Sequence, residues 1–215
     1  MYEKYYGLSE NPFSIQPDPE FIYFLRRHEL AYAMLEYGIM DRAGFSVITG
    51  EVGCGKTSLI RYLLTNLNVE HKVGLVSNTH EDIANLLEWV MMAFGEPYDG
   101  MSQVALYDKF QSFLIEQFKQ GRKVLLIVDE AQNLSVRALE SLRMLSNINA
   151  DKHQLIQIIL VGQPELKDKL ALPELRQLAQ RVAVDFHLTP LQEDEVDSYI
   201  SYRLSVAGRK KRVFT

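Results

Sequence analysis

A complete phosphate-binding loop, G-x-x-x-x-G-K-[ST], lies at residues 50–57. In this pattern glycines let backbone N–H groups turn inward around phosphates, the lysine adds a positive charge, and the Ser/Thr hydroxyl binds Mg²⁺. An apolar run precedes the loop and a helix-like spacing follows it, as the motif requires. The loop therefore predicts a nucleoside triphosphate site. The expected contact residues are Gly50, Glu51, Val52, Gly53, Cys54, Gly55, Lys56, Thr57 and Ser58.

A pair of carboxylates, Asp129 and Glu130, ends the apolar run 124–128. At the end of a buried strand, Asp129 is expected to hold Mg²⁺ together with the Thr57 hydroxyl. Glu130 is expected to polarise the attacking water, which makes hydrolysis the predicted reaction. The alternative is an ordinary solvated acidic turn.

Two further polar positions suit phosphate chemistry. Gln163 follows the apolar run 156–161 and precedes Pro164, so it is expected beside the γ-phosphate if its strand lies between those of the loop and Asp129. Arg181 is the candidate arginine finger for a neighbouring subunit, with Arg176 less favoured. The alternatives are an exposed turn glutamine and surface ion pairs.

The composition is that of one ordinary domain, or of one domain with a fragment of a second. Of 215 residues 47% are hydrophobic, and a net charge of −5 does not suggest a generally basic surface for binding nucleic acid. No apolar run approaches the roughly 18 residues that span a bilayer, and one cysteine cannot form an internal disulfide. Without a secretory signal at the start, a cytoplasmic location is expected.

Apolar runs rich in Val, Ile and Leu alternate with helical patterns, which predicts an α/β domain with a parallel sheet. Four strands are expected to be covered on both faces, whereas the last alternates and is expected at an edge. The expected strands are 45–49, 72–77, 123–129, 155–161 and 182–187. The expected helices are 28–42, 81–94, 104–119 and 193–207, with another that begins near Ser135.

The last predicted helix carries an apolar stripe, Val196, Tyr199, Ile200 and Leu204. Such a stripe needs a partner surface, so a second, helical unit is expected to begin here.

Four more segments carry a resemblance to a known family. They are LIVDEAQNL at 126–134, LVGQPEL at 160–166, LRQLAQRV at 175–182, and an opening with Tyr5-Tyr6-Gly7-Leu8, Pro12-Phe13, Pro17-Asp18-Pro19 and His28. With the phosphate loop, they resemble the AAA+ ATPases of the ExeA type. These are general-secretion-pathway protein A and related ATPases of exosortase/PEP-CTERM gene clusters. The MuB and TniB transposition ATPases are similar at a greater distance.

The resemblance implies a P-loop NTPase of the AAA+ class, a five-stranded parallel sheet flanked by helices, with the Gln163 strand between those of Thr49 and Asp129. Residues 1–44 would be an entry segment and helix, 45–190 the ATPase core, and 191–215 the start of a helical lid. The cofactors would be ATP and Mg²⁺. The roles it assigns are Walker A for Lys56 and Thr57, Walker B for Asp129 and Glu130, sensor 1 for Gln163 and finger for Arg181.

The resemblance also places the adenine near the entry segment, against Pro12, Phe13 or Tyr23. Two features depart from the family. The chain ends at Thr215 before any Gly-x-Pro-Arg-like lid segment, and Cys54 stands where a small hydroxyl residue is usual. Cys54 is expected to be either a small buried side chain or a thiol whose pKa the nearby Lys56 lowers.

The leading hypothesis is an oligomerising Mg²⁺-dependent ATPase that drives assembly or regulation of a bacterial secretion or envelope system. The family links such domains to membrane and peptidoglycan-binding regions, here beyond residue 215. A DNA-binding regulator of the transposition type is the alternative, based on Arg26-Arg27 and Arg209-Lys210-Lys211-Arg212. A third class, a scaffold that binds nucleotide without hydrolysis, is disfavoured by the complete set of catalytic residues.

Overall fold

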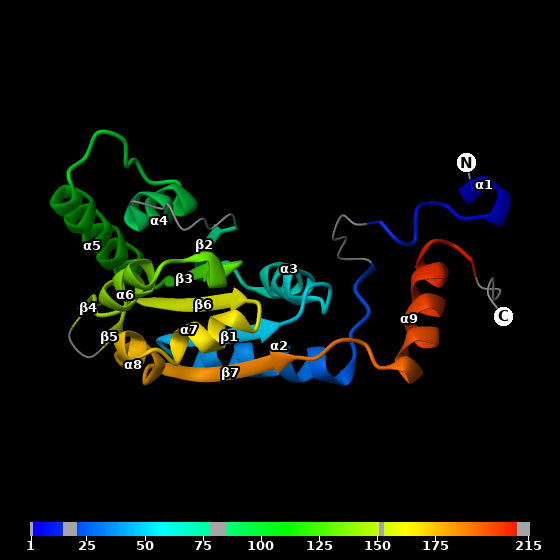
Figure 1. Cartoon of the computed structure of the whole chain (residues 1–215). Helices are drawn as coiled ribbons and strands as arrows, with labels where there is room; N and C mark the ends of the chain where they lie inside the picture. Colours follow the sequence, from blue (N-terminus) through cyan, green and yellow to red (C-terminus); the bar gives the residue numbers. More distant parts are fainter. Residues whose placement is uncertain (1, 15–20, 78–84, 151–152, 210–215) are drawn as a thin grey trace.

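A parallel sheet of five strands forms the centre of the protein (Figure 1). The computed structural model describes residues 2–14, 21–77, 85–150 and 153–209. All four pairings are parallel, in the order β2-β3-β6-β1-β7. The strands are β1 (Phe45–Gly50), β2 (His71–Val76), β3 (Lys123–Val128), β6 (Ile156–Gly162) and β7 (Val182–Leu188).

Helices cover both faces of this sheet, because successive side chains of each strand point to opposite sides. In β1, Phe45 and Val47 join one core cluster and Ile48 joins the other. The cluster of Ile48 packs against α2 (Arg26–Met40) and α3 (Lys56–Asn66). The helices around the other cluster are α4 (Leu86–Phe94), α5 (Gln103–Lys119), α6 (Val136–Leu145), α7 (Glu165–Leu170) and α8 (Arg176–Ala179).

The five predicted strands are confirmed, and so is the edge position of β7. The prediction that the second strand is covered on both faces is wrong. β2 is the other edge, and its Leu75 is 42% exposed. A short antiparallel hairpin, β4 (Asn149–Ala150) and β5 (His153–Gln154), was not predicted.

The predicted helices are also present. The first residues of the helix expected from position 81 lie outside the described part of the chain, and α4 begins at Leu86. α6 follows Ser135, whose hydroxyl caps its first turn by accepting the Ala138 N–H at 3.2 Å. Five short helical segments of the described residues were not predicted: α1 (Tyr2–Tyr6), η2 (Ala131–Asn133), α7, η3 (Pro173–Leu175) and α8.

The last helix, α9 (Glu193–Val206), leaves the sheet after β7 and packs against the entry segment, beside α1 (Figure 1). The Ser9 N–H donates to the Ala207 carbonyl at 2.9 Å, and the rings of Tyr23 and Tyr202 are 5.1 Å apart. The predicted partner surface is thus supplied, at least in part, by this chain's own entry segment. None of the described helices is long and apolar enough to cross a membrane.

Candidate nucleotide-binding site

The phosphate loop lies at the carboxyl end of β1 and opens α3. Gly53 and Gly55 have φ angles of 81° and 93°, in the left-handed region that favours glycine. Gly50 is needed for a different reason than expected. A Cβ on Gly50 would lie 2.5 Å from the Leu188 carbonyl oxygen and 2.6 Å from Cys54 Sγ, so close packing against β7 excludes a side chain there.

Lys56 is folded onto its own loop. Its Nζ is buried and donates to the carbonyls of Gly50 at 2.7 Å and Glu51 at 2.9 Å. These are neutral acceptors, and a phosphate oxygen is a stronger, charged one. The ammonium group is therefore already held beside the loop, where it can exchange these carbonyls for a phosphate.

Thr57 and Asp129 meet across the site, although they are far apart in the sequence. Thr57 Oγ1 donates to Asp129 Oδ2 at 3.4 Å, and the other carboxylate oxygen accepts the Glu130 N–H at 2.9 Å. Burial raises the pKa of Asp129, and the charge of Glu130 adds to this. A buried carboxylate beside a hydroxyl is a donor set that fits Mg²⁺, whose charge would favour the ionised form.

Glu130 and Gln163 are brought together, as the predicted strand order requires. β6 pairs with both β1 and β3, so the ends of three strands lie side by side. Gln163 Nε2 donates to Glu130 Oε2 at 3.5 Å. Glu130 has a φ of 53°, a left-handed conformation that is uncommon for a residue with a side chain.

Gln132, to which the sequence analysis gave no role, links these two residues. Its Nε2 donates to Glu130 Oε2 at 2.6 Å, and its Oε1 accepts the backbone N–H of Gln163 at 3.0 Å. A Cβ on Gly162 would lie 2.8 Å from that Oε1, so this glycine makes room for the amide. The pattern Asp-Glu-Ala-Gln followed by Gly-Gln was a signal that could have indicated the contact.

The two candidate finger residues lie away from this chain's own loop. Val182 pairs with Phe45 at the start of β1, so Arg181 lies at the amino ends of the strands, opposite to the carboxyl ends where the phosphate loop lies. Its guanidinium donates to Ser146 Oγ at 3.1 Å. Arg176 is exposed at the start of α8.

A pocket lies beside the phosphate loop. Of the three residues expected near adenine, Tyr23 lines it, whereas Pro12 and Phe13 do not. Instead Pro12 is buried, with its carbonyl accepting from Arg203, and Phe13 is 43% exposed. The lining residues come from the entry segment and α2, the phosphate loop and α3, and α9 with its approach: Phe21, Ile22, Tyr23, Phe24, Leu25, Arg27, His28, Gly53, Cys54, Gly55, Ser58, Leu59, Leu191, Tyr199 and Arg203.

Cys54 is buried, and this burial raises the pKa of its thiol despite the nearby Lys56 charge. The structure thus supports the small buried side chain rather than the reactive thiol.

Comparisons with known proteins agree with this geometry. A family described as an AAA domain matches residues 39–170. The General secretion pathway protein A of Aeromonas hydrophila is 42% identical over all of this chain and over 40% of its own length. The chain therefore spans about two fifths of that relative.

Solved structures share the fold at low identity. The ORC2 protein of Aeropyrum pernix has a TM-score of 0.64 and 18% identity, covering 89% of this chain and 56% of its own. Cdc6p of Pyrobaculum aerophilum has a TM-score of 0.65 and 17% identity, covering 87% and 53%. These similarities bear on the fold alone, and they confirm the predicted one.

Proposed function

This chain belongs to the AAA domain family, and from that premise we propose that it is an ATPase that hydrolyses ATP with Mg²⁺ as an oligomer, to drive assembly or regulation of a bacterial secretion or envelope system. The proposal of ATP hydrolysis rests on one observation: Lys56, Thr57, Asp129 and Glu130 lie together at the carboxyl ends of the strands. The secretion part rests on the 42% identity to the Aeromonas hydrophila protein.

Each residue has a role that its position supports. The loop N–H groups and Lys56 bind the phosphates, while Thr57 and Asp129 would hold Mg²⁺, which neutralises charge that develops on the transferred group. Glu130 orients and polarises the water that attacks phosphorus. Gln163, next to Glu130, lies where it can contact the γ-phosphate.

The oligomeric part is supported by the position of Arg181. Since it lies at the opposite end of the strands from this chain's own loop, it can complete only a neighbouring subunit's site. An arginine supplied in this way neutralises transition-state charge, with a typical effect of about 10³–10⁵ on the rate.

The hydrolytic assignment is tested with Glu130→Gln in a steady-state phosphate-release assay, with ATP affinity measured in parallel. We expect turnover to fall at least about 100-fold while ATP still binds, because the amide keeps the size but loses the base. Full turnover by this variant would refute the role of Glu130.

The shared site is tested by mixing Arg181→Ala subunits with Glu130→Gln subunits. Each variant lacks a different half of the proposed site, so mixed oligomers contain some complete sites and regain activity. Absence of recovery at every ratio would refute the finger assignment.

The alternative of DNA as a partner was based on basic residues, and some of these make contacts within the chain. Arg27 is held by Glu195 and Arg209 donates to the Tyr6 carbonyl, so part of the basic sequence makes internal contacts. Residues 210–212 lie outside the described part of the chain. The same phosphate-release assay with and without duplex DNA, repeated as salt is raised, separates this alternative.

A further inference from the structure

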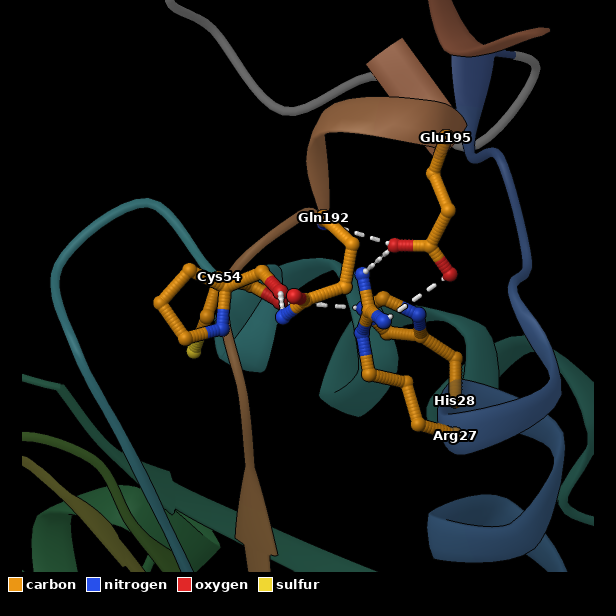
Figure 2. Close-up of polar contacts among 6 residues, drawn as sticks. Arg27, His28, Cys54, Gln192 and Glu195 are labelled. Atoms are coloured by element: carbon orange, nitrogen blue, oxygen red, sulfur yellow. Dashed lines mark hydrogen bonds and ion pairs between the residues drawn. The ribbon is translucent and has the colours of Figure 1, made fainter.

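The first turn of α2 contacts both the phosphate loop and α9 (Figure 2). His28 Nε2 lies 2.9 Å from the carbonyl oxygen of Cys54, within the phosphate loop. The preceding residue, Arg27, makes a bidentate ion pair with Glu195 of α9, at 3.0 and 2.7 Å. Of the four residues in these two contacts, only Cys54 belongs to a nucleotide-binding motif.

The contact with Cys54 fixes the form of the imidazole. A carbonyl oxygen only accepts, so Nε2 carries the hydrogen and the neutral ring has its lone pair on Nδ1. Nδ1 is buried and finds no hydrogen-bond partner within the described residues. Burial also lowers the pKa of His28, which agrees with a neutral ring that donates from Nε2.

The same contact fixes the orientation of one peptide group in the loop. The peptide is planar and trans, so the Gly55 N–H points opposite to the Cys54 carbonyl. His28 draws that carbonyl toward α2 and thereby directs the Gly55 N–H away from α2. A Cβ on Gly55 would lie 2.8 Å from His28 Nε2, so the contact needs glycine at this position in addition to the φ of 93°.

We propose that His28 is a positioning residue for the phosphate loop: its Nε2–H holds the Cys54 carbonyl so that the Gly55 N–H is directed at the phosphates of the nucleotide. The proposal rests on the proposed function, because it concerns the same site. The hydrogen bond acts on phosphates in the ground state and the transition state alike. Its loss therefore weakens nucleotide binding and raises KM while kcat stays nearly unchanged.

The test compares His28→Gln with His28→Phe in the full chain. Glutamine can place an N–H donor where Nε2 lies, whereas phenylalanine keeps a flat ring without a donor. His28→Asn is a second variant without the contact, since its shorter amide ends near the position of Nδ1. Dissociation constants are measured for fluorescent ATP and GTP analogues, and kcat and KM for ATP.

We expect His28→Phe and His28→Asn to bind both nucleotides about tenfold more weakly, the effect of one lost hydrogen bond. His28→Gln is expected to stay within about threefold of the wild type. A weaker ATP affinity with unchanged GTP affinity would overturn the proposal, since it would make His28 a contact of the base. Wild-type nucleotide affinity in both His28→Phe and His28→Asn would also overturn it. So would an equal loss of affinity in these two variants and in His28→Gln.

Lys56→Ala separates this outcome from failure of the proposed function. It removes a direct phosphate contact and is expected to abolish binding. If Lys56→Ala binds like the wild type, the nucleotide site itself is wrong. If only Lys56→Ala loses affinity, the site stands and the role of His28 is refuted.

Discussion

Glu130 is held in place by amide groups rather than by its own conformational preference. Its left-handed backbone is a conformation that a residue with a side chain adopts at a cost, of order 1–3 kcal/mol. The amides of Gln132 and Gln163 both approach the same carboxylate oxygen, Oε2. The orientation of the proposed base therefore depends in part on Gln132, which has no contact with water or phosphate in the proposed mechanism.

We predict that Gln132→Ala lowers kcat about tenfold and changes the KM for ATP little, because the carboxylate loses its closest partner while the phosphate loop is intact. Steady-state phosphate release over a range of ATP concentrations measures both constants. Asn133→Ala, at an exposed position in the same short helix, is the matched control. Wild-type kcat in Gln132→Ala would contradict the prediction.

Burial of His28 makes a prediction for the pH dependence of stability. Burial lowers its pKa, the hydrogen bond with the Cys54 carbonyl opposes this, and the smaller effects of the Arg27 and Glu195 charges lower and raise it, respectively. The unfolded chain then binds a proton that the folded chain does not, so stability is full above the unfolded pKa of about 6.5 and falls as the pH decreases toward the lowered value. Urea unfolding at pH 7.5 and 5.5 should show a smaller loss in His28→Gln than in the wild type. An equal loss in both proteins would show that His28 does not contribute.

At the residue level, the motifs and the contacts between them were predicted, whereas contacts of a motif with residues outside any motif were not. Lys56, Thr57, Asp129 and Glu130 were found because each lies in a short pattern whose spacing reflects the chemistry. The contact between His28 and Cys54 joins residues 26 positions apart, and no periodicity in the sequence specifies such a distance. Only the fold brings them together.

Among the elements, α9 is held at its amino terminus by a residue with two roles. Glu195 accepts the backbone N–H of Gln192 at 2.8 Å in a capping box, and its carboxylate also binds Arg27 of α2 (Figure 2). The ion pair lowers the pKa of Glu195, mainly through the hydrogen bond from Arg27. The residue that begins the helix thus also joins it to α2.

We predict that Glu195→Gln loosens α9, because glutamine retains the capping box but loses the charge that binds Arg27. Hydrogen exchange of the α9 amides should become faster in Glu195→Gln and in Arg27→Met. The double variant should be no faster than the faster single variant, since both changes remove the same interaction. Additive effects would show that the two residues act independently.

Strands of the sheet were predicted more reliably than their surroundings. An apolar run identifies a strand from local sequence alone. The exposure of β2, however, depends on which elements lie beside it, and the run does not show that. The hairpin of β4 and β5 has two residues in each strand and is too short for any periodicity. For α9, the apolar stripe predicted a partner surface but not that the entry segment would supply part of it.

Across the whole molecule, the candidate nucleotide site collects residues that are far apart in the sequence. The pocket beside the phosphate loop is lined by Phe21 and Tyr23 of the entry segment and by Tyr199 and Arg203 of α9. The strand order was implied by family resemblance and is confirmed. The contacts of the entry segment with α9 could not be predicted, because they join parts of the chain that have no pattern in common.

We predict that ATP with Mg²⁺ raises the Tm of Glu130→Gln by about 5–10 °C at a concentration near 100 times Kd. Ligand binding at that level stabilises by about 2.7 kcal/mol, and each kcal/mol shifts Tm by about 2–4 °C in a chain of this size. Thermal unfolding followed by circular dichroism measures the shift. Addition of EDTA should reduce it, and Lys56→Ala should abolish it. An equal shift with and without EDTA would contradict the role of Mg²⁺.

The contact of Arg203 with the Phe21 carbonyl joins residues 182 positions apart, at 3.1 Å. During synthesis the entry segment leaves the ribosome before α9, and at roughly 5–20 residues per second about 10–40 s pass until that helix follows. Phe21 is 3% exposed in the folded protein, but throughout this interval α9 is not yet present to cover it. The pocket beside the phosphate loop is thus completed only after α9 has been synthesised.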